Sequence, residues 1–393
     1  MNERKKFMTY DVAVIGGGAS GMACAVRLLQ GNKNLKICVI DAGERLGKKL
    51  AATGNGQGNI SNLDMDASHY HGVNIALADK IACSRKFDVT GLFDCLFTAD
   101  DRGRIYPSGR QASALCDGLI SKLKGKCEIM LATRVTEIGQ GFKLELSDGK
   151  SLAAKFVVVC TGGKAQKQFK TDGSAYSLVT KLGHTLTPLY PSLVQLKTDT
   201  KYIKTLKGIR TECTVTALSG GAVIGESRGD VIFTDYGVSG NAIFELSSYV
   251  VDVQGVELSL EFLPDFDKEV IIKNLAERKS AGTPVSELLS GTLHNQIGRA
   301  IIARAQSQDE KQIVHTLKNF KLPVLGTLGF DYAQVTKGGV KTEEITDCLE
   351  SKIVKNLFFA GEILDVDGDC GGFNLQWAFT SGMTAADEIL KRL

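Results

Sequence analysis

The chain has little proline and no long apolar run. Only 6 of its 393 residues are proline, against 43 glycines. No apolar stretch approaches the ~18 residues of a membrane-spanning helix, and the N-terminal sequence MNERKKFMTYD lacks the apolar core of a secretory signal. We therefore expect a cytoplasmic protein with no membrane partner. The many glycines are expected where the backbone turns sharply or approaches a ligand.

The ten cysteines contain no CxxC pair. Cys83 and Cys95 lie too far apart in sequence to indicate the redox pair of a disulfide oxidoreductase. Cys24, Cys38 and Cys160 each fall within an apolar pattern, which is typical of reduced cysteines in a protein core. The sequence therefore predicts free thiols rather than disulfides.

Metal-binding spacings are also absent. The five histidines form no HExxH or Cys/His zinc pattern, and HYHG at residues 69–72 is interpreted as a pair in a surface loop. An EF-hand loop started at Asp365 would need Gly and Glu where Cys370 and Gln376 stand. We predict no metal site, and we expect the three alternating aspartates to shape a loop, some by bonding their own backbone: Asp365, Asp367 and Asp369.

Charge gives no reason to expect a polyanionic partner. The formal net charge is only +3, and the densest basic run, Arg4 to Lys6, is interpreted as a solvated tail. We predict a small-molecule substrate and no nucleic-acid partner. The sequence does not indicate an oligomeric state.

The segment YDVAVIGGGASGMACAVRLLQGNKNLKICVID is typical of a strand, a tight turn, a helix and a second strand. Residues 12–15 are continuously apolar, as in a strand buried on both faces of a parallel sheet. The helix carries one apolar face, and Gly31 is placed to end it. The second strand, residues 36–40, stops at Asp41.

The turn between the first strand and the helix contains Gly16, Gly18 and Gly21 in the spacing G-x-G-x-x-G. The first glycine permits a tight turn, the second lets the backbone approach a pyrophosphate, and the third allows close packing of helix on sheet. Asp41 lies twenty residues after Gly21, where a carboxylate can accept hydrogen bonds from a ribose diol. The pattern predicts a dinucleotide site and favours FAD or NAD(H) over NADP(H).

Two features near this motif leave alternatives open. In RLGKK, Lys48 and Lys49 either bring positive charge to phosphates or lie in a solvated loop. A second complete G-x-G-x-x-G is absent, so we expect no separate nicotinamide domain. If NAD(P)H is the electron donor, it docks transiently.

Later segments predict an interrupted α/β domain. KFVVVCTGG (155–163) and NLFFAGE (356–362) are typical of buried strands whose C-terminal ends face a ligand. Between them, residues 192–262 have an antiparallel β pattern and residues 265–319 a helical one. A strand-like stretch, 322–339, then leads back to the first domain.

The sequence resembles a family of bacterial FAD-dependent oxidoreductases that includes aminoacetone oxidase and a bile-acid-inducible flavoprotein reductase. The resemblance covers nearly the whole chain, through segments that include VIGGGASGMACA, RLGKKLAATGNGQGNISN, GRIYPSGRQAS, FTDYGVSG and NLFFAGEILDVDGDCGGFNLQWAFTSG. It implies an α/β fold in which a Rossmann-like, two-segment FAD domain carries a β-barrel-like insert and a small helical domain. The corresponding ranges are 1–191 and 338–393 for the FAD domain, 192–262 and 321–337 for the β-rich insert, and 263–320 for the helical insert.

The resemblance also implies how FAD is bound. The loop from Gly54 to Asn59 is expected to approach the flavin, and the start of the last helix is expected to lie under its ring, where the helix dipole stabilises negative charge. Including the glycine motif and the two lysines, the expected FAD-binding residues are Gly16, Gly18, Ala19, Ser20, Gly21, Asp41, Ala42, Lys48, Lys49, Gly54, Asn55, Gly56, Asn59, Val135, Thr161, Gly162, Gly361, Glu362, Gly372, Phe373, Asn374 and Gln376.

Catalytic residues are less evident. Many relatives have Arg-Cys after GNG, whereas this chain has Gln57 and Gly58, so their substrate does not transfer directly. The substrate-side candidates, each of which also has an ordinary structural interpretation, are Tyr106, Arg110, Tyr236 and Lys337.

We therefore predict a flavoenzyme with hydride transfer at flavin N5, driven by NAD(P)H and reducing a small organic substrate. Two alternatives remain open at this point. One is an oxidase of a small amine or amino ketone that produces peroxide. The other is a flavin-binding regulatory or interaction protein with little turnover.

Overall fold

The computed structural model describes residues 8–84 and 87–393, so the basic run at Arg4 to Lys6 lies outside the described residues. The chain divides into two compact units. The first contains the chain up to Tyr190 and from Val335 onward, and the second contains Pro191–Gln334. None of the helices in the described ranges combines the length and apolar character that a membrane span requires.

A seven-stranded sheet forms the centre of the first unit, with the order β7-β2-β1-β10-β9-β8 and with β19 paired to β10. Its central strands are parallel and buried, as the continuous apolar runs predict. The strands are β1 (Met8–Ile15), β2 (Ile37–Ile40), β7 (Glu128–Met130), β8 (Val135–Ile138), β9 (Lys143–Leu146), β10 (Ser151–Val159) and β19 (Leu357–Phe359).

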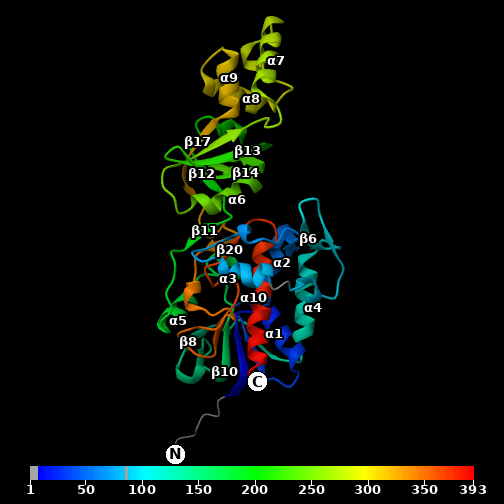
Figure 1. Ribbon diagram of the computed structural model, residues 1–393, viewed down its shortest axis with the longest axis vertical. Helices are drawn as coiled ribbons and strands as arrows, with labels where there is room; N and C mark the ends of the chain where they lie inside the picture. Colours follow the sequence, from blue (N-terminus) through cyan, green and yellow to red (C-terminus); the bar gives the residue numbers. More distant parts are fainter. Residues whose placement is uncertain (1–7, 85–86) are drawn as a thin grey trace, which may run out of the picture. The chain divides into compact units, whose positions relative to one another are not determined.

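Helices α1 (Ala19–Gly31) and α10 (Phe373–Leu390) run side by side in this unit (Figure 1). They approach closely because Gly382 has no side chain: a Cβ there would lie 2.2 Å from the Ser20 carbonyl oxygen. The helix α1 ends at Gly31, as predicted. The Leu390 side chain occupies the position where a Cβ at Gly31 would lie. This packing places the start of α1 beside the middle of α10.

Smaller elements complete the first unit. Two small sheets have the orders β3-β6-β5 and β20-β4. Their strands are β3 (Ser61–Asn62), β4 (Tyr70–His71), β5 (Phe97–Ala99), β6 (Arg104–Pro107) and β20 (Asp367–Gly368). The remaining helices are α2 (Lys48–Ala52), α3 (Ala76–Ala78), α4 (Ala112–Leu123) and α5 (Tyr176–Lys181). The connecting segments carry β11 (Tyr190–Ser192) and β18 (Val335–Lys337).

The second unit is a closed barrel with the order β12-β15-β14-β13-β16-β17, together with four helices. Helices α7, α8 and α9 lie together beside the barrel strands of their own unit (Figure 1). The strands are β12 (Leu196–Thr198), β13 (Arg210–Ser219), β14 (Ala222–Phe233), β15 (Gly237–Ser239), β16 (Val256–Glu261) and β17 (Phe320–Thr327). The helices are α6 (Asn241–Val250), α7 (Lys268–Ser280), α8 (Asn295–Ala305) and α9 (Glu310–Lys318).

The α/β fold with a barrel and a helical insertion is confirmed. The segment 192–262 was predicted to be β-rich, and beside its strands it contains a helix that was not predicted, α6, whose apolar side chains pack into the barrel core. The prediction of free cysteines is also confirmed: Cys24, Cys38 and Cys160 are buried thiols.

Candidate cofactor and active site

The glycine turn after β1 has the geometry that the motif predicts. Gly16 has a φ of +103°, and a Cβ there would lie 2.3 Å from the Cys160 carbonyl oxygen. A Cβ at Gly21 would lie 1.9 Å from the Gly16 carbonyl oxygen, so both positions require glycine. Gly18, in contrast, faces open space, and α1 begins after it without a side-chain cap. Open space at an uncapped helix start suits a phosphate group.

Asp41, at the end of β2, fixes the backbone around this turn. Its Oδ2 accepts a hydrogen bond from the Gly17 amide (2.6 Å) and its Oδ1 accepts one from the Gly43 amide (2.7 Å). Each carboxylate oxygen has a second lone pair, so the group retains acceptor capacity for a ribose hydroxyl. The Thr133 amide donates to the Asp41 carbonyl (2.9 Å), which places Val135, at the start of β8, two residues from this end of the site.

Lys48 and Lys49 have different environments. Lys49 Nζ lies 2.9 Å from Glu362 Oε2, and both side chains are largely buried, whereas Lys48 lies 3.6 Å from the exposed Glu44. Glu362 Oε1 accepts a hydrogen bond from the Thr336 amide (2.9 Å). The structure therefore brings Lys49 and Glu362 together beside Gly162 and Gly163, and it places Lys48 in a solvated pair.

The opposite end of the site lies at the start of α10. Gly372 has a φ of +104°, and a Cβ there would lie 2.3 Å from the Ser61 carbonyl oxygen and 2.8 Å from Asn59 Oδ1. The helix begins there without a side-chain cap. Gly361 lies close to α1, since a Cβ on it would be 2.7 Å from Ser20 Oγ, and its amide donates to Ser381 Oγ (2.9 Å). Gly361 thus connects the start of α1 to the middle of α10.

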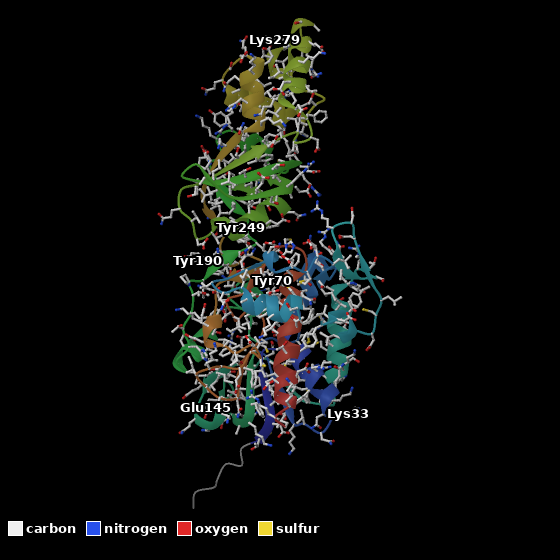
Figure 2. The ribbon with its side chains drawn as sticks, viewed as in Figure 1. Lys33, Tyr70, Glu145, Tyr190, Tyr249 and Lys279 are labelled. Atoms are coloured by element: carbon white, nitrogen blue, oxygen red, sulfur yellow. The ribbon has the colours of Figure 1, made fainter. Side chains whose placement is uncertain are left out.

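Three predicted contact residues at α10 have side chains engaged by the protein itself. Asn374 Oδ1 accepts from the Gly368 amide (2.9 Å), and its Nδ2 donates to the Gly368 carbonyl (2.6 Å). Gln376 Oε1 accepts from Ser61 Oγ (2.8 Å). The Phe373 side chain is buried. The hydroxyl of Tyr70, which is labelled in Figure 2, donates to the Phe373 carbonyl (3.1 Å). The backbone amides of Phe373 and Asn374, in the first turn of α10, have no acceptor within the helix, whereas the Gln376 amide donates to the Gly372 carbonyl (2.9 Å).

Two of the four catalytic candidates lie beside the predicted flavin loop. A Cβ on Gly54 would lie 3.7 Å from the ring of Tyr106, and the Arg110 guanidinium lies 3.9 Å from the centroid of that ring. Burial raises the pKa of Tyr106. Arg110 has a φ of +49° and lies before α4, so it is an exposed loop residue over an aromatic face.

The other two candidates lie in different units. Lys337 follows Thr336 in β18. Its positive charge acts to lower the pKa of both His71 and Asp365. Tyr236 lies in the second unit, between β14 and β15, where its carbonyl accepts from the Thr198 amide (3.1 Å). The structure therefore associates Tyr106, Arg110 and Lys337 with the first unit and Tyr236 with the barrel.

Two aspartates of the acidic loop after β19 bond to other segments of the chain. Asp365 Oδ2 accepts from the Val73 amide (3.1 Å), and burial raises its pKa. Asp369 is hydrogen bonded to His69 (3.0 Å) and His71 (2.7 Å), so these histidines are not a free surface-loop pair. The pairing of β4 with β20 holds the loop beside these histidines. No group of three potential metal ligands occurs among residues 8–84 and 87–393.

Buried polar atoms without partners test whether a dinucleotide fits. Among the described residues, Thr161 Oγ1 and Asn59 Oδ1 are buried with no hydrogen-bond partner. Thr161 adjoins Gly16 at the α1 end, and Asn59 adjoins Gly372 at the α10 end. Unsatisfied groups of this kind are costly unless a ligand or water completes them. The residues present therefore fit a long polar cofactor that reaches both ends.

Sequence reasoning missed several residues that support this site. Thr336 is buried, and its Oγ1 accepts from the amides of Lys164 (2.7 Å) and Ala165 (3.1 Å). The hydroxyl of Tyr176 is buried without a partner, near the charge of Glu362. These residues carry no motif of their own, because their roles depend on contacts between segments distant in sequence.

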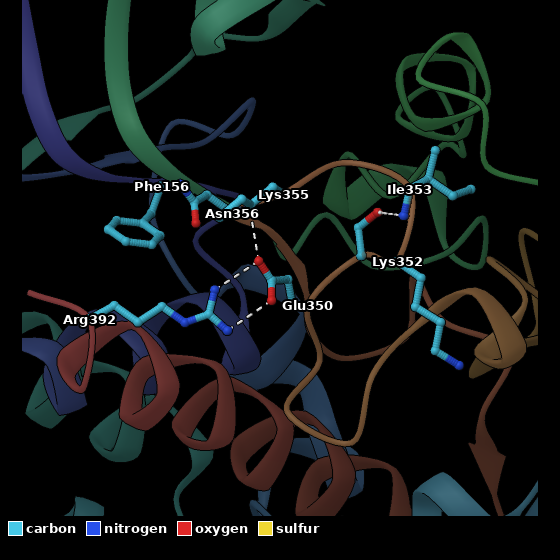
Figure 3. Close-up of a pocket in the computed structure, with 8 residues that line it drawn as sticks. Phe156, Glu350, Lys352, Ile353, Lys355, Asn356 and Arg392 are labelled. Atoms are coloured by element: carbon cyan, nitrogen blue, oxygen red, sulfur yellow. Dashed lines mark hydrogen bonds and ion pairs between the residues drawn. The ribbon is translucent and has the colours of Figure 1, made fainter.

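A separate cavity in the first unit does not involve the glycine motif (Figure 3). There, Arg392 contacts both carboxylate oxygens of Glu350 at 2.8 Å. The lining residues are Phe156, Glu350, Ser351, Lys352, Ile353, Lys355, Asn356 and Arg392. Since its acid is already paired with arginine and none of the predicted site residues lines it, this cavity is not the candidate active site.

Known proteins with similar sequences give an independent comparison. The sequence model of the HI0933-like protein Rossmann domain matches residues 10–388. The 3-dehydro-bile acid delta(4,6)-reductase of Clostridium scindens is 33% identical over 406 residues, covering 97% of this chain and 99% of that protein. The ribosomal RNA dihydrouridine synthase of Haemophilus influenzae is 29% identical over 409 residues, covering 96% of this chain and 98% of that protein.

A solved structure supports the fold assignment. The 3-ketosteroid delta1-dehydrogenase from Sterolibacterium denitrificans superposes with a TM-score of 0.53 at 12% identity, covering 98% of this chain and 100% of the other. At that identity the likeness shows a shared fold alone.

Proposed function

The chain belongs to the HI0933-like family of FAD-binding Rossmann proteins, and from this premise we propose that it reduces a carbon–carbon double bond in a small organic substrate with electrons from NAD(P)H. As a member of this family it is an FAD-dependent oxidoreductase. The electron donor, the substrate and the role of each site residue belong to our proposal. When bound, FAD supplies the redox chemistry by taking up a hydride at N5 and passing it on.

The observation that supports the FAD-binding part of the proposal is the pair of unsatisfied polar atoms at the two ends of one site. Thr161 Oγ1 lies at the glycine turn, and Asn59 Oδ1 lies at the start of α10. We assign the first to the ADP half of FAD and the second to the ring half. The uncapped start of α1 would meet the pyrophosphate, and that of α10 would stabilise negative charge on the ring.

The reaction class follows from what two relatives have in common. One is named as a delta(4,6)-reductase of a bile acid and the other as a synthase of dihydrouridine in ribosomal RNA. Both names describe the addition of hydrogen across a carbon–carbon double bond conjugated to a carbonyl group. We therefore propose an activated alkene as the substrate class, with Tyr106, Arg110 and Lys337 as candidate substrate contacts.

A small enone is preferred to RNA, because the bile-acid reductase is the more similar of these two relatives and the net charge is only +3. The dihydrouridine synthase nevertheless leaves the prediction of no nucleic-acid partner open. RNA is the second candidate substrate. The oxidase and the regulatory protein remain the alternatives from other classes.

A product assay separates these functions. The purified protein is supplied with FAD and NADH or NADPH, then with a 3-oxo-4-ene steroid, an unmodified ribosomal RNA transcript, or a small amine with oxygen. Our proposal predicts a steroid product heavier by two hydrogens, formed in proportion to the nicotinamide oxidised.

Each alternative has its own outcome. Dihydrouridine in the transcript without steroid reduction would favour RNA, and steady peroxide formation from the amine would favour the oxidase. Bound FAD that no nicotinamide reduces and no substrate reoxidises would contradict the reductase and favour the regulatory protein.

A further inference from the structure

Carboxylates and imidazoles alternate between the surface and the start of α10. Asp64 Oδ2 lies 3.3 Å from His69 Nε2, and His69 Nδ1 lies 3.0 Å from Asp369 Oδ2. The other oxygen, Asp369 Oδ1, lies 2.7 Å from His71 Nε2. We propose that these four groups form a proton relay from solvent to the substrate end of the site. The proposal rests on the proposed function, because the reduction of an alkene consumes a proton.

The exposure of the four side chains falls along the relay. Asp64 is 81% exposed and His69 27%, whereas Asp369 is 18% and His71 15% exposed. One end therefore exchanges protons with water and the other is shielded from it.

The relay is held against the helix start to which we assign the ring half of FAD. The His69 ring stacks on Phe373, the first residue of α10, with centroids 4.1 Å apart and an interplanar angle of 17°. The Asp369 amide donates to the His69 carbonyl (2.9 Å). Asn374, the second residue of α10, donates to the Asp369 carbonyl (3.3 Å). These contacts fix the spacing of the relay groups relative to α10.

Charges around His71 favour its protonated form. Burial and the positive charge of Lys337, in β18, both act to lower the pKa of His71. The hydrogen bond to Asp369 and the charges of Asp367 and Asp369 outweigh both, so its pKa lies above the ordinary value of 6.5. His71 thus holds a proton at a pH where a free histidine begins to lose it.

The chemistry needs one proton in each turnover. A hydride that originates in the nicotinamide forms a C–H bond at one carbon of the substrate double bond. The π electron pair of the double bond moves toward the conjugated carbonyl. It then forms a C–H bond between a proton and the second carbon of the former double bond. We assign this proton to His71, whose Nε2 is reprotonated through Asp369 from His69 and, through Asp64, from solvent.

Kinetics of His71→Gln and His69→Gln test the relay in the FAD-loaded protein, with His315→Gln as control. His315 is an exposed histidine on α9 in the other unit. Each variant is assayed for reduction by NAD(P)H, for reoxidation by ferricyanide, which adds no proton to carbon, and for reoxidation by the enone.

The relay predicts that His71→Gln slows only the enone step, by about 100-fold, the loss typical of a missing general acid. It also predicts that the pH dependence of that step disappears. His69→Gln should slow it about tenfold, with rescue by imidazole in the buffer, because this position reaches solvent. A His71→Gln enzyme with the wild-type enone rate and pH profile would overturn the proposal. So would a His71→Gln enzyme whose rates of reoxidation by enone and by ferricyanide fall by the same factor.

A titration that needs no turnover separates the relay from the proposed function. In histidine-labelled protein, NMR should show that Asp369→Asn lowers the pKa of His71, because the change removes the carboxylate that is hydrogen bonded to this ring. A His71 pKa unaffected by Asp369→Asn would refute the relay even in an active enzyme. Wild-type protein that binds FAD but reduces no alkene would refute the proposed function, whatever the titration shows.

Discussion

At the scale of single residues, the Asp41 carboxylate connects the end of β2 to the glycine turn through the amides of Gly17 and Gly43. The change Asp41→Ala removes both of these hydrogen bonds as well as the proposed bond to ribose. Hydrogen bonds to a charged group are worth about 1.5–3 kcal/mol each, so we expect FAD to bind about 10- to 100-fold more weakly. Fluorescence titration of the protein with FAD measures this loss.

Asp11→Ala is the matched control for that experiment. Asp11 also accepts a hydrogen bond from a backbone amide, that of Lys36 (2.9 Å), and pairs with Lys155 (2.8 Å), but it lies in the N-terminal half of β1, away from the glycine turn. It should alter stability without changing FAD affinity. Equal FAD affinity in wild-type and Asp41→Ala protein would contradict the assigned role of Asp41.

Residue identity alone predicted part of the site. The glycines and Asp41 have spacings that are typical of a strand, a turn and a helix, so their local geometry could be predicted. Thr336 and Tyr176 could not be found in this way, because their importance lies in contacts with Lys164, Ala165 and Glu362. The same limit explains the error at His69 and His71, whose partner Asp369 lies about three hundred residues further on.

At the scale of elements, the site depends on the contact between α1 and α10. Gly382→Ala would place a methyl group 2.2 Å from the Ser20 carbonyl oxygen. Because that neighbour is backbone, the helices must separate, at a cost of about 1–3 kcal/mol. We expect a lower free energy of unfolding and weaker FAD binding, measured by urea unfolding and FAD titration.

Gly118→Ala serves as the control for the helix contact. Gly118 lies inside α4, and a Cβ there has no neighbour within 4 Å. This change should stabilise the protein by about 0.5–1 kcal/mol through better helix propensity. If Gly382→Ala were as harmless as Gly118→Ala, the close approach of α1 and α10 would not be needed for the site.

The ion pair between Glu350 and Arg392, just after the end of α10, should make the free energy of unfolding depend on pH. The hydrogen bonds from Arg392 lower the pKa of Glu350 below its ordinary value of 4.5. A carboxylate whose pKa is depressed by folding stabilises the protein above pH 4.5 and loses that effect as the pH falls through its folded pKa. Glu350→Gln should therefore cost about 1 kcal/mol at pH 6 and much less at pH 3.5, as measured by urea unfolding. A cost independent of pH would contradict the ion pair.

At the scale of the whole molecule, the order of strand and helix patterns predicted an α/β domain interrupted by an insertion of mixed β and helical character. That the β part forms a barrel was implied by the resemblance to the flavoprotein family. Buried parallel strands and amphipathic helices carry strong periodic signals. Helix α6 was missed because it lies between short strands, in a segment rich in Thr, Val and Gly. The five-part division, the cytoplasmic location and the absence of a nucleic-acid partner stay predictions.

The visible absorption spectrum of the purified protein tests the central claim most directly. It is recorded without oxygen, first alone, then with NADH or NADPH, and finally with a 3-oxo-4-ene steroid. We predict flavin bands that bleach with the nicotinamide and return with the steroid. A colourless protein that does not bind added FAD would contradict the account.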